Sequence, residues 1–97
     1  PQDVILDSAG NLLVTDTSNY RIRRITPAGI ISTIAGTGRN GFGGDGGPPL
    51  LADMTPGWLA FGPDGTLYVS DDGDLSLAGN KRVWQIRNNV VTTVAGN

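Results

Sequence analysis

The chain of 97 residues contains no cysteine, no histidine and no glutamate. Without cysteine it can form no disulfide, and it offers no thiolate as a nucleophile or metal ligand. Without histidine it lacks the side chain that most often serves as a general base near neutral pH and as a zinc ligand. The absence of glutamate, a strong helix former, fits a chain with little surface helix. These absences exclude thiol chemistry and histidine-based sites.

Charge and apolar patterning argue against two further classes. The net charge is −2, with seven Lys and Arg against nine Asp, whereas a nucleic-acid surface needs a basic footprint. No apolar run approaches the roughly 20 residues of a membrane span, and no signal-peptide pattern opens the chain. We therefore expect no nucleic acid, no membrane and no cofactor as a partner. Because residue 1 is Pro1 and not Met, we also expect an excised or processed piece.

The chain does contain an internal repeat. The stretch GNLLVTDTSNYRIRRITPAGIISTIAG, from Gly10 to Gly36, recurs in degenerate form from Gly65 to Gly96. Six pairs share one offset of 55 residues, namely Pro1/Pro56, Val4/Leu59, Gly10/Gly65, Leu12/Leu67, Val14/Val69 and Asp16/Asp71. After an insertion in the second copy, the copies regain step at Asn19/Asn80, Arg21/Arg82 and Ile22/Val83. A period of roughly 40–50 residues is typical of a propeller blade.

Each copy contains four short apolar runs separated by turn residues, which predicts four strands. In the first copy these are residues 4–6, 12–16, 20–26 and 30–34, and in the second 59–61, 66–70, 82–87 and 90–94. The continuous run Val4–Leu6 suits a strand buried on both faces. Tight turns between successive strands give an up-and-down antiparallel sheet. The sequence thus predicts an all-β protein of two four-stranded antiparallel blades, residues 1–36 and 56–97.

Residues 37–55 form a Gly/Pro-rich connector between the predicted blades, too rich in Gly and Pro for a regular strand or helix. We expect one helical turn over Leu50–Met54, with Phe42 and either Leu50 or Leu51 holding the connector against the surface. The run Gly41–Gly47 lacks both the G-K-[ST] ending and the strand-to-helix frame of a phosphate loop. We therefore interpret its glycines as turn residues.

The sequence GNLLVTD…NYRIRRITPAGIISTIAG, followed by GFGGDGGPPLLADM, resembles NHL-repeat β-propellers, as does PDGTLYVSD…NKRVWQI…TTVAG in the second copy. The resemblance covers nearly the whole chain. It implies a toroid of four-stranded blades, usually about six, which serves mainly as a scaffold that binds proteins and in some members RNA or sugars. One branch resembles lyases and other enzymes with metal ligands in the channel, but this chain has two blades and no His for such ligands.

Two blades leave one uncovered face at each end of the pair, and a repeat array generally needs at least three units to be stable. We therefore expect a closed propeller formed by homo-oligomerisation, in which the second blade of one chain packs on the first blade of another. Three chains would give six blades and four chains eight, and we expect the trimer first. The contact is head-to-tail and closes only if the rotation closes.

Two carboxylates end the predicted second strands, and two arginines open the third strands. We interpret Asp16 with Arg21, and Asp71 with Arg82, as structural braces of the turn, because buried charges are paired. A catalytic carboxylate is the alternative. Since the sequence offers no convergent set of acid, base and nucleophile, we predict no catalytic residues.

Three further features suggest sites. Asp71, Asp72 and Asp74 could hold Ca²⁺ through hard oxygen ligands, although the spacing lacks the EF-hand period and a solvated acidic loop is the simpler interpretation. Trp58 lies at the entry to an inner strand, where it could contact a ligand at a toroid face, while Trp84 is expected to pack against a neighbouring blade. The basic stripe of Tyr20, Arg21, Arg23 and Arg24 is interpreted as inter-blade donors and surface charge, with RNA binding as the alternative.

The sequence thus favours a non-catalytic NHL-like propeller fragment that assembles into a ring-shaped scaffold or binding module. One alternative is a fragment of a lyase- or lactonase-like propeller enzyme with Asp residues around its channel. Another is a propeller that binds a peptide or a glycan through its loops. Loop detail, which the fold does not determine, selects the ligand of a propeller.

Overall fold

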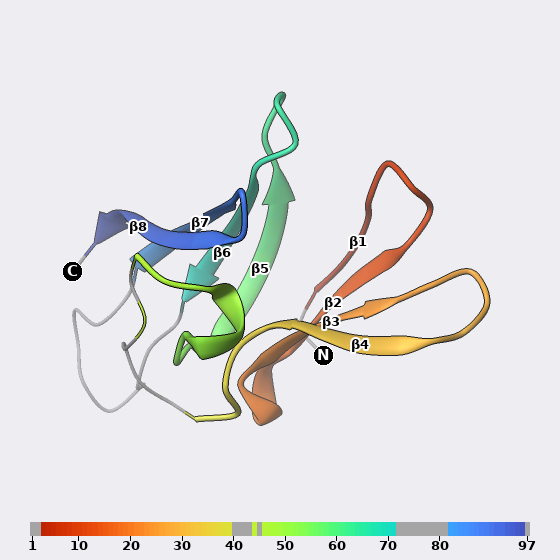
Figure 1. The fold of residues 1–97 in the computed structure, drawn as a ribbon, viewed down its shortest axis with the longest axis horizontal. Helices are drawn as coiled ribbons and strands as arrows, with labels where there is room; N and C mark the ends of the chain where they lie inside the picture. The colour runs from red at the N-terminus through yellow and green to blue at the C-terminus, as the bar shows by residue number, and fades with distance from the viewer. Residues whose placement is uncertain (1–2, 40–43, 45, 72–81, 97) are drawn as a thin grey trace.

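The computed structural model describes residues 3–39, 44, 46–71 and 82–96 of the chain. It contains two four-stranded sheets, in each of which neighbouring strands are antiparallel and follow the order of the sequence (Figure 1). The first sheet consists of β1 (Val4–Leu6), β2 (Leu12–Asp16), β3 (Arg21–Ile25) and β4 (Ile31–Ala35). The second consists of β5 (Pro56–Phe61), β6 (Leu67–Asp71), β7 (Arg82–Arg87) and β8 (Val90–Gly96). The predicted all-β class with two antiparallel four-stranded sheets is confirmed.

The two sheets repeat each other in register as well as in sequence. Equivalent register partners are Asp16–Arg21 and Asp71–Arg82, Val14–Arg23 and Val69–Trp84, and Leu12–Ile25 and Leu67–Ile86. Both sheets shift register at the same point between their third and fourth strands, at Ile22/Arg23 and at Val83/Trp84. Each residue of one sheet therefore has a structural equivalent in the other, on the same face.

Turn residues explain where the strands end. Asn88 and Asn89 join β7 to β8 with φ of 52° and 59°, the pair of left-handed conformations that a two-residue hairpin requires. The Asp7 carboxylate accepts hydrogen bonds from the Ala9 and Asn11 amides between β1 and β2. The Asn11 side chain also donates to this carboxylate, and these bonds lower the pKa of Asp7. The first 3₁₀ helix, η1 (Thr17–Asn19), ends at Tyr20, whose φ is 57°.

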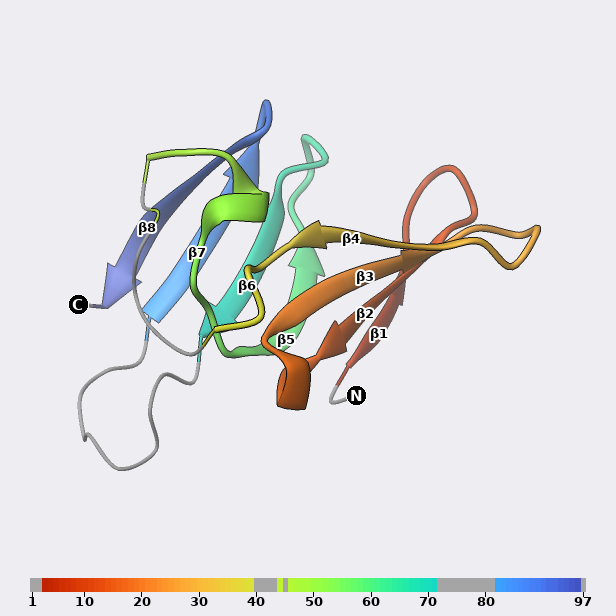
Figure 2. The ribbon, with the colours of Figure 1, turned by 60° about the horizontal axis from the view of Figure 1, so that its bottom comes forward.

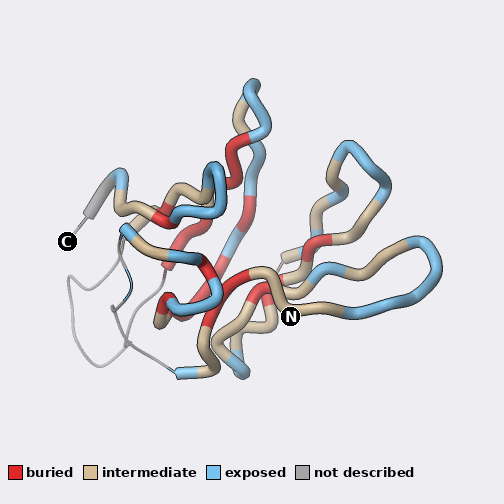
Figure 3. Tube along the Cα trace, in the orientation of Figure 1, coloured by how far each residue is buried: buried red, intermediate tan, exposed pale blue. Residues whose placement is uncertain are grey.

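The core lies between the two sheets. Side chains alternate between the faces of a strand, so each sheet contributes one face to this seam, and the figures show the sheets side by side (Figure 2). The buried cluster comprises Leu13, Ile22 and Ala35 of the first sheet, Ala52 and Met54 of the connector, and Leu59, Leu67, Val69, Trp84 and Val91 of the second sheet. Buried residues are concentrated there, while the hairpin tips are exposed (Figure 3).

The connector crosses from β4 to the outer edge of the second sheet before it enters β5. Its Gly46 and Gly47 exchange backbone hydrogen bonds with Val91 of β8. A second 3₁₀ helix, η2 (Pro49–Leu51), then lies beside β4, and the Gly36 amide donates to the Pro49 carbonyl across that contact.

The prediction of which side chains anchor the connector was wrong. Leu50 and Leu51 are 52% and 66% exposed, whereas Pro49, Ala52 and Met54 are buried. The turn at Pro49–Leu51 directs both leucines outward because they fall on its solvent side. Phe42, the other predicted anchor, lies outside the described residues.

The prediction that the run Val4–Leu6 is buried on both faces was also wrong. Val4 is 52% exposed and Leu6 64% exposed, while Ile5 between them packs against the core. The second sheet covers only one face of β1. The other face therefore carries exposed apolar side chains.

Two glycines with positive φ make a matched test of the fold. At Gly36, φ is 95° and a Cβ atom would collide with the backbone of Tyr20 and Arg21, whereas at Gly29, with φ of 86°, a Cβ atom would meet open space. Replacing Gly29 with Ala should cost about 1 kcal/mol of unfolding free energy, from backbone strain alone. Replacing Gly36 with Ala should cost about 3 kcal/mol or more, because the backbone must also move. Urea unfolding of both variants measures the difference, and equal losses would contradict this account of β4.

Candidate functional site

The seam inside the chain shows how one blade recognises the next. The Asp3 carboxylate accepts a hydrogen bond from the Leu59 amide, with Oδ2 2.8 Å from the nitrogen, and its other oxygen accepts from the Val4 amide. The Thr17 hydroxyl donates to the Pro56 carbonyl at 2.8 Å. Polar contacts thus fix the inner edge of the seam, where β1 and β2 lie against β5, and apolar packing fills the rest.

The candidate site is the open face of the first sheet, the face that points away from the second sheet. Its apolar residues are Val4, Leu6, Leu12, Val14, Ile25 and Ile31, and Asp16 and Arg23 lie on the same face. Val4, Leu6 and Ile31 are more than half exposed, and the other three are partly buried by their neighbours in the sheet. Each of the six has an apolar equivalent in the second sheet. Those equivalents face the seam, and all but Phe61 and Ile86 are buried.

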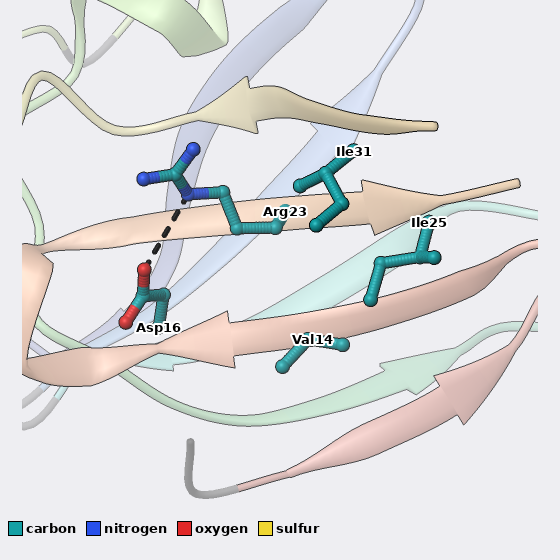
Figure 4. A pocket seen from close by; sticks show the side chains of 5 residues that line it. All are labelled: Val14, Asp16, Arg23, Ile25 and Ile31. Carbon is teal, nitrogen blue, oxygen red and sulfur yellow. Dashed lines mark ion pairs between the residues drawn. The ribbon is translucent and has the colours of Figure 1, made fainter. Parts of the chain in front are cut away.

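A hollow of about 380 Å³ lies on this open face, lined by Val14, Asp16, Arg23, Ile25 and Ile31. Figure 4 shows the three aliphatic side chains at one end and the ion pair at the other. Arg23 Nε lies 3.4 Å from Asp16 Oδ2, and the two side chains are 31% and 26% exposed. The hollow therefore combines apolar walls with a partly exposed guanidinium held by a carboxylate.

The structure corrects the predicted brace of the first blade. Asp16 and Arg21 are register partners. The Asp16 carboxylate, however, forms its ion pair with Arg23 and accepts a hydrogen bond from the side-chain amide of Asn19. Arg21 donates instead to the Thr37 carbonyl. Arg23 lies one place further along the same face, and its Nε approaches the carboxylate diagonally. Asp16 and Arg21 thus face each other across the two strands, but the side chain that pairs with the Asp16 carboxylate is that of Arg23.

The second blade uses the same geometry with a different donor. Asp71 is 1% exposed, and its Oδ2 accepts a hydrogen bond of 2.6 Å from Trp84 Nε1, while its Oδ1 accepts from the Thr55 amide. Trp84 is the structural equivalent of Arg23. Arg82, the predicted partner of Asp71, places its guanidinium 4.9 Å from the centre of the Trp84 ring and donates to Thr93 Oγ1. Each carboxylate thus binds an N–H group from the same third-strand position.

The second unpartnered surface is the outer face of the second sheet. It carries Trp58, Ala60, Tyr68, Gln85, Thr92 and Val94, which alternate with the residues of the seam. Trp58 is 48% exposed and Val94 49% exposed. Trp58, predicted at the entry to an inner strand near a possible ligand face, lies in β5, and its role in ligand contact stays a prediction.

The structure places one member of the proposed calcium site. Both oxygens of Asp71 already accept hydrogen bonds from the protein, and Asp72 and Asp74 lie outside the described residues. Within the described part of the chain, no three His, Cys, Asp or Glu residues group closely enough to hold a metal. The calcium hypothesis stays a prediction.

Two other hollows flank the seam. One lies between the hairpin turns, lined by Asp7, Ser8, Phe61, Gly62, Pro63 and Gly65. The other lies at the outer edge, lined by Arg24, Thr33, Ile34, Pro49, Leu50, Ile86 and Asn89. Neither brings together an acid, a base and a nucleophile. No helix in the described ranges is long and apolar enough to cross a membrane.

Comparison with protein-family models finds no match for this chain, and comparison with curated proteins finds none either. The two open faces are therefore the features of the molecule that indicate a function. Sequence reasoning anticipated uncovered faces but missed the hollow. Alternation within the predicted strand places Tyr68 on the face opposite Leu67 and Val69, and the register confirms this.

Replacing Trp84 with Phe tests the buried donor. Phe keeps most of the apolar volume but leaves Asp71 Oδ2 without the indole N–H, so the free energy of unfolding should fall by about 2–4 kcal/mol. The control is Trp58→Phe, which in dilute solutions of the dissociated chain should change stability by less than about 0.5 kcal/mol because Trp58 is half exposed there. Urea unfolding followed by far-UV circular dichroism measures both. A loss at Trp84 no larger than at Trp58 would refute the role of this hydrogen bond.

Proposed function

We propose that the chain is a non-catalytic two-blade unit of an NHL-like propeller, and that copies of it pack head to tail into a closed, ring-shaped scaffold. The observation that supports this proposal is which two faces of the sheets are uncovered. They are the structural equivalents of the two faces that pack together inside the chain. A copy therefore offers at each end the kind of surface that the other end needs.

The pairing follows from the register. Inside the chain, the inner face of the first sheet, with Leu13 and Ile22, packs on the inner face of the second, with Val69 and Trp84. The outer face of the second sheet is equivalent to that inner face of the first. The open face of the first sheet is equivalent to the inner face of the second. Packing one chain's outer face on the next chain's open face repeats the internal seam between molecules.

The total surface does not itself demand a partner. Its 5282 Å² is close to the roughly 5,300 Å² expected for a monomer of this mass. Instead, the argument depends on where the apolar surface lies, because Val4, Leu6 and Ile31 share one face. Scattered exposed apolar residues need no explanation, whereas a contiguous group on a sheet face marks an interface.

The free energy of burying apolar side chains, compared with the free-energy cost of association, sets how many residues of the open face the contact between copies must bury. Complete burial of one aliphatic side chain contributes about 1.5–3 kcal/mol, while association costs about 4–15 kcal/mol in lost freedom. Val4, Leu6 and Ile31 alone do not overcome that cost. Adding the half-buried residues of the open face, together with Trp58 and Val94 of the opposing face, brings the sum into the range of stable association. The contact that closes a ring is intramolecular and adds further stability.

A six-bladed ring needs three copies and an eight-bladed ring four, and we favour the trimer. Such a ring presents its loops as a scaffold for a peptide or a glycan. A lyase- or lactonase-like enzyme fragment remains the alternative from another class.

Light scattering on a sizing column tests the assembly. At micromolar concentration we expect a mass near three times 10.1 kDa, and Ile31→Asp should reduce it to 10.1 kDa because a charge enters the apolar seam. The control is Ile30→Asp, since Ile30 is 64% exposed, like Ile31 at 61%, but lies in the hairpin turn outside the strand. A monomeric wild-type chain, or equal dissociation by both variants, would contradict the proposal.

A further inference from the structure

We infer that the seam between copies is built around Tyr68, which fills the hollow beside Arg23 of the next copy, while Trp58 covers Val4 at the inner edge. This inference rests on the proposed function and names the contacts that the assembly would use. It follows from transferring each contact of the internal seam to the equivalent residues of the two open faces.

The contact at the inner edge of the internal seam has equivalent residues on the two open faces. Inside the chain, Asp3 meets the second sheet at the Leu59 amide. The equivalents of Asp3 and Leu59 are Trp58 and Val4, both about half exposed. No carboxylate is needed at Trp58 for this contact, because the Val4 amide already donates to Asp3 of its own chain. An indole that covers an exposed valine therefore replaces the polar contact of the internal seam.

The centre of the internal seam also has equivalent residues on the two open faces. Leu13 and Trp84 belong to the same buried cluster of the internal seam, a small side chain from the first sheet and a large one from the second. Their equivalents are Tyr68 on the outer face and Arg23 on the open face. The large ring has moved to the other side of the seam. Because Arg23 fills less space than an indole, the open face keeps the hollow, and Tyr68 supplies the volume that the hollow lacks.

The chemistry of the hollow suits a phenol. Val14, Ile25 and Ile31 give apolar walls for the ring, and the Arg23 guanidinium, which Asp16 holds in place, can stack on its face. The phenol hydroxyl remains next to polar groups, as a buried tyrosine requires. In the free chain Tyr68 is partly buried, against the turn at Gly62. Its ring is therefore positioned before the copies meet.

The same arrangement selects against wrong pairings. Two open faces brought together would place the Arg23 side chains and the Asp16 side chains of both copies in one apolar interface. Two outer faces would bring Trp58 and Tyr68 together with no hollow to receive them. Only the head-to-tail contact gives Tyr68 a hollow and Trp58 an exposed valine to cover, and such a contact generates a closed ring of copies when its rotation closes.

Exchanging the two residues tests the central contact. We expect Tyr68→Leu to weaken association about tenfold because it empties the hollow, and Arg23→Trp to weaken it because an indole and a phenol cannot share the space. The double variant places leucine and tryptophan at the positions equivalent to Leu13 and Trp84 of the internal seam, so its dissociation constant should return to within about threefold of the wild-type value. Sedimentation equilibrium measures the constants, with circular dichroism confirming the fold of each variant.

Cysteine cross-linking tests the inner edge, since the chain has no native cysteine. Val4→Cys and Trp58→Cys chains, mixed and oxidised, should form a disulfide-linked species of about twice 10.1 kDa, and neither chain alone should form it. Linking in the separate solutions would overturn the head-to-tail arrangement.

The outcomes separate the two proposals. An assembled wild type whose Tyr68 and Arg23 effects are simply additive, or which gives no mixed disulfide, overturns this inference and leaves the ring proposal standing. A monomeric wild type overturns both. Compensation by the double variant together with the mixed disulfide supports both.

Discussion

A four-stranded blade is apolar on both faces, and this single constraint governs the whole molecule. One seam inside the chain covers one face of each sheet, and through Leu13, Val69 and Trp84 it supplies the buried core. The remaining two faces have the same origin and much of the same chemistry, because the copies share register down to the position of their bulges. The stability of the chain therefore depends on this contact, and the association that we propose would use the same kind of contact.

The two equivalent carboxylates, Asp16 and Asp71, differ in their exposure to water and in the donor that each binds. Asp71 is buried, and Trp84 at the equivalent of Arg23 gives it a neutral N–H donor. In the free chain Asp16 is partly exposed, and the cation that Arg23 supplies there keeps part of its contact with water. The exchange of Trp for Arg follows the exposure of the site in the free chain and leaves the strand register unchanged.

Much of this fold could be predicted from the sequence, because the repeat aligns two weak strand patterns and each supports the other. The eight strands, their order and the turn at Asn88 and Asn89 followed from alternation and turn chemistry. What could not be predicted depends on contacts between elements. The brace was assigned to Arg21, since register alone does not reveal that Arg23 approaches Asp16 diagonally. The connector anchors were misassigned because a Gly/Pro-rich segment has no periodicity to separate its buried side from its exposed side.

The internal seam also bears on whether association ends in a ring or continues as a filament. A head-to-tail contact closes only if each step turns by a whole fraction of a circle. Inside the chain, the rotation that relates the first sheet to the second is fixed by the core and by two hydrogen bonds. These bonds join the Asp3 and Thr17 side chains to the backbone of Leu59 and Pro56. If the seam between copies reproduces that turn, every blade is related to the next by one rotation, and closure depends on that rotation alone. In the proposed seam between copies a large ring lies on the opposite side from Trp84 of the internal seam. A similar thickness of the two seams is the condition under which they would share a single angle.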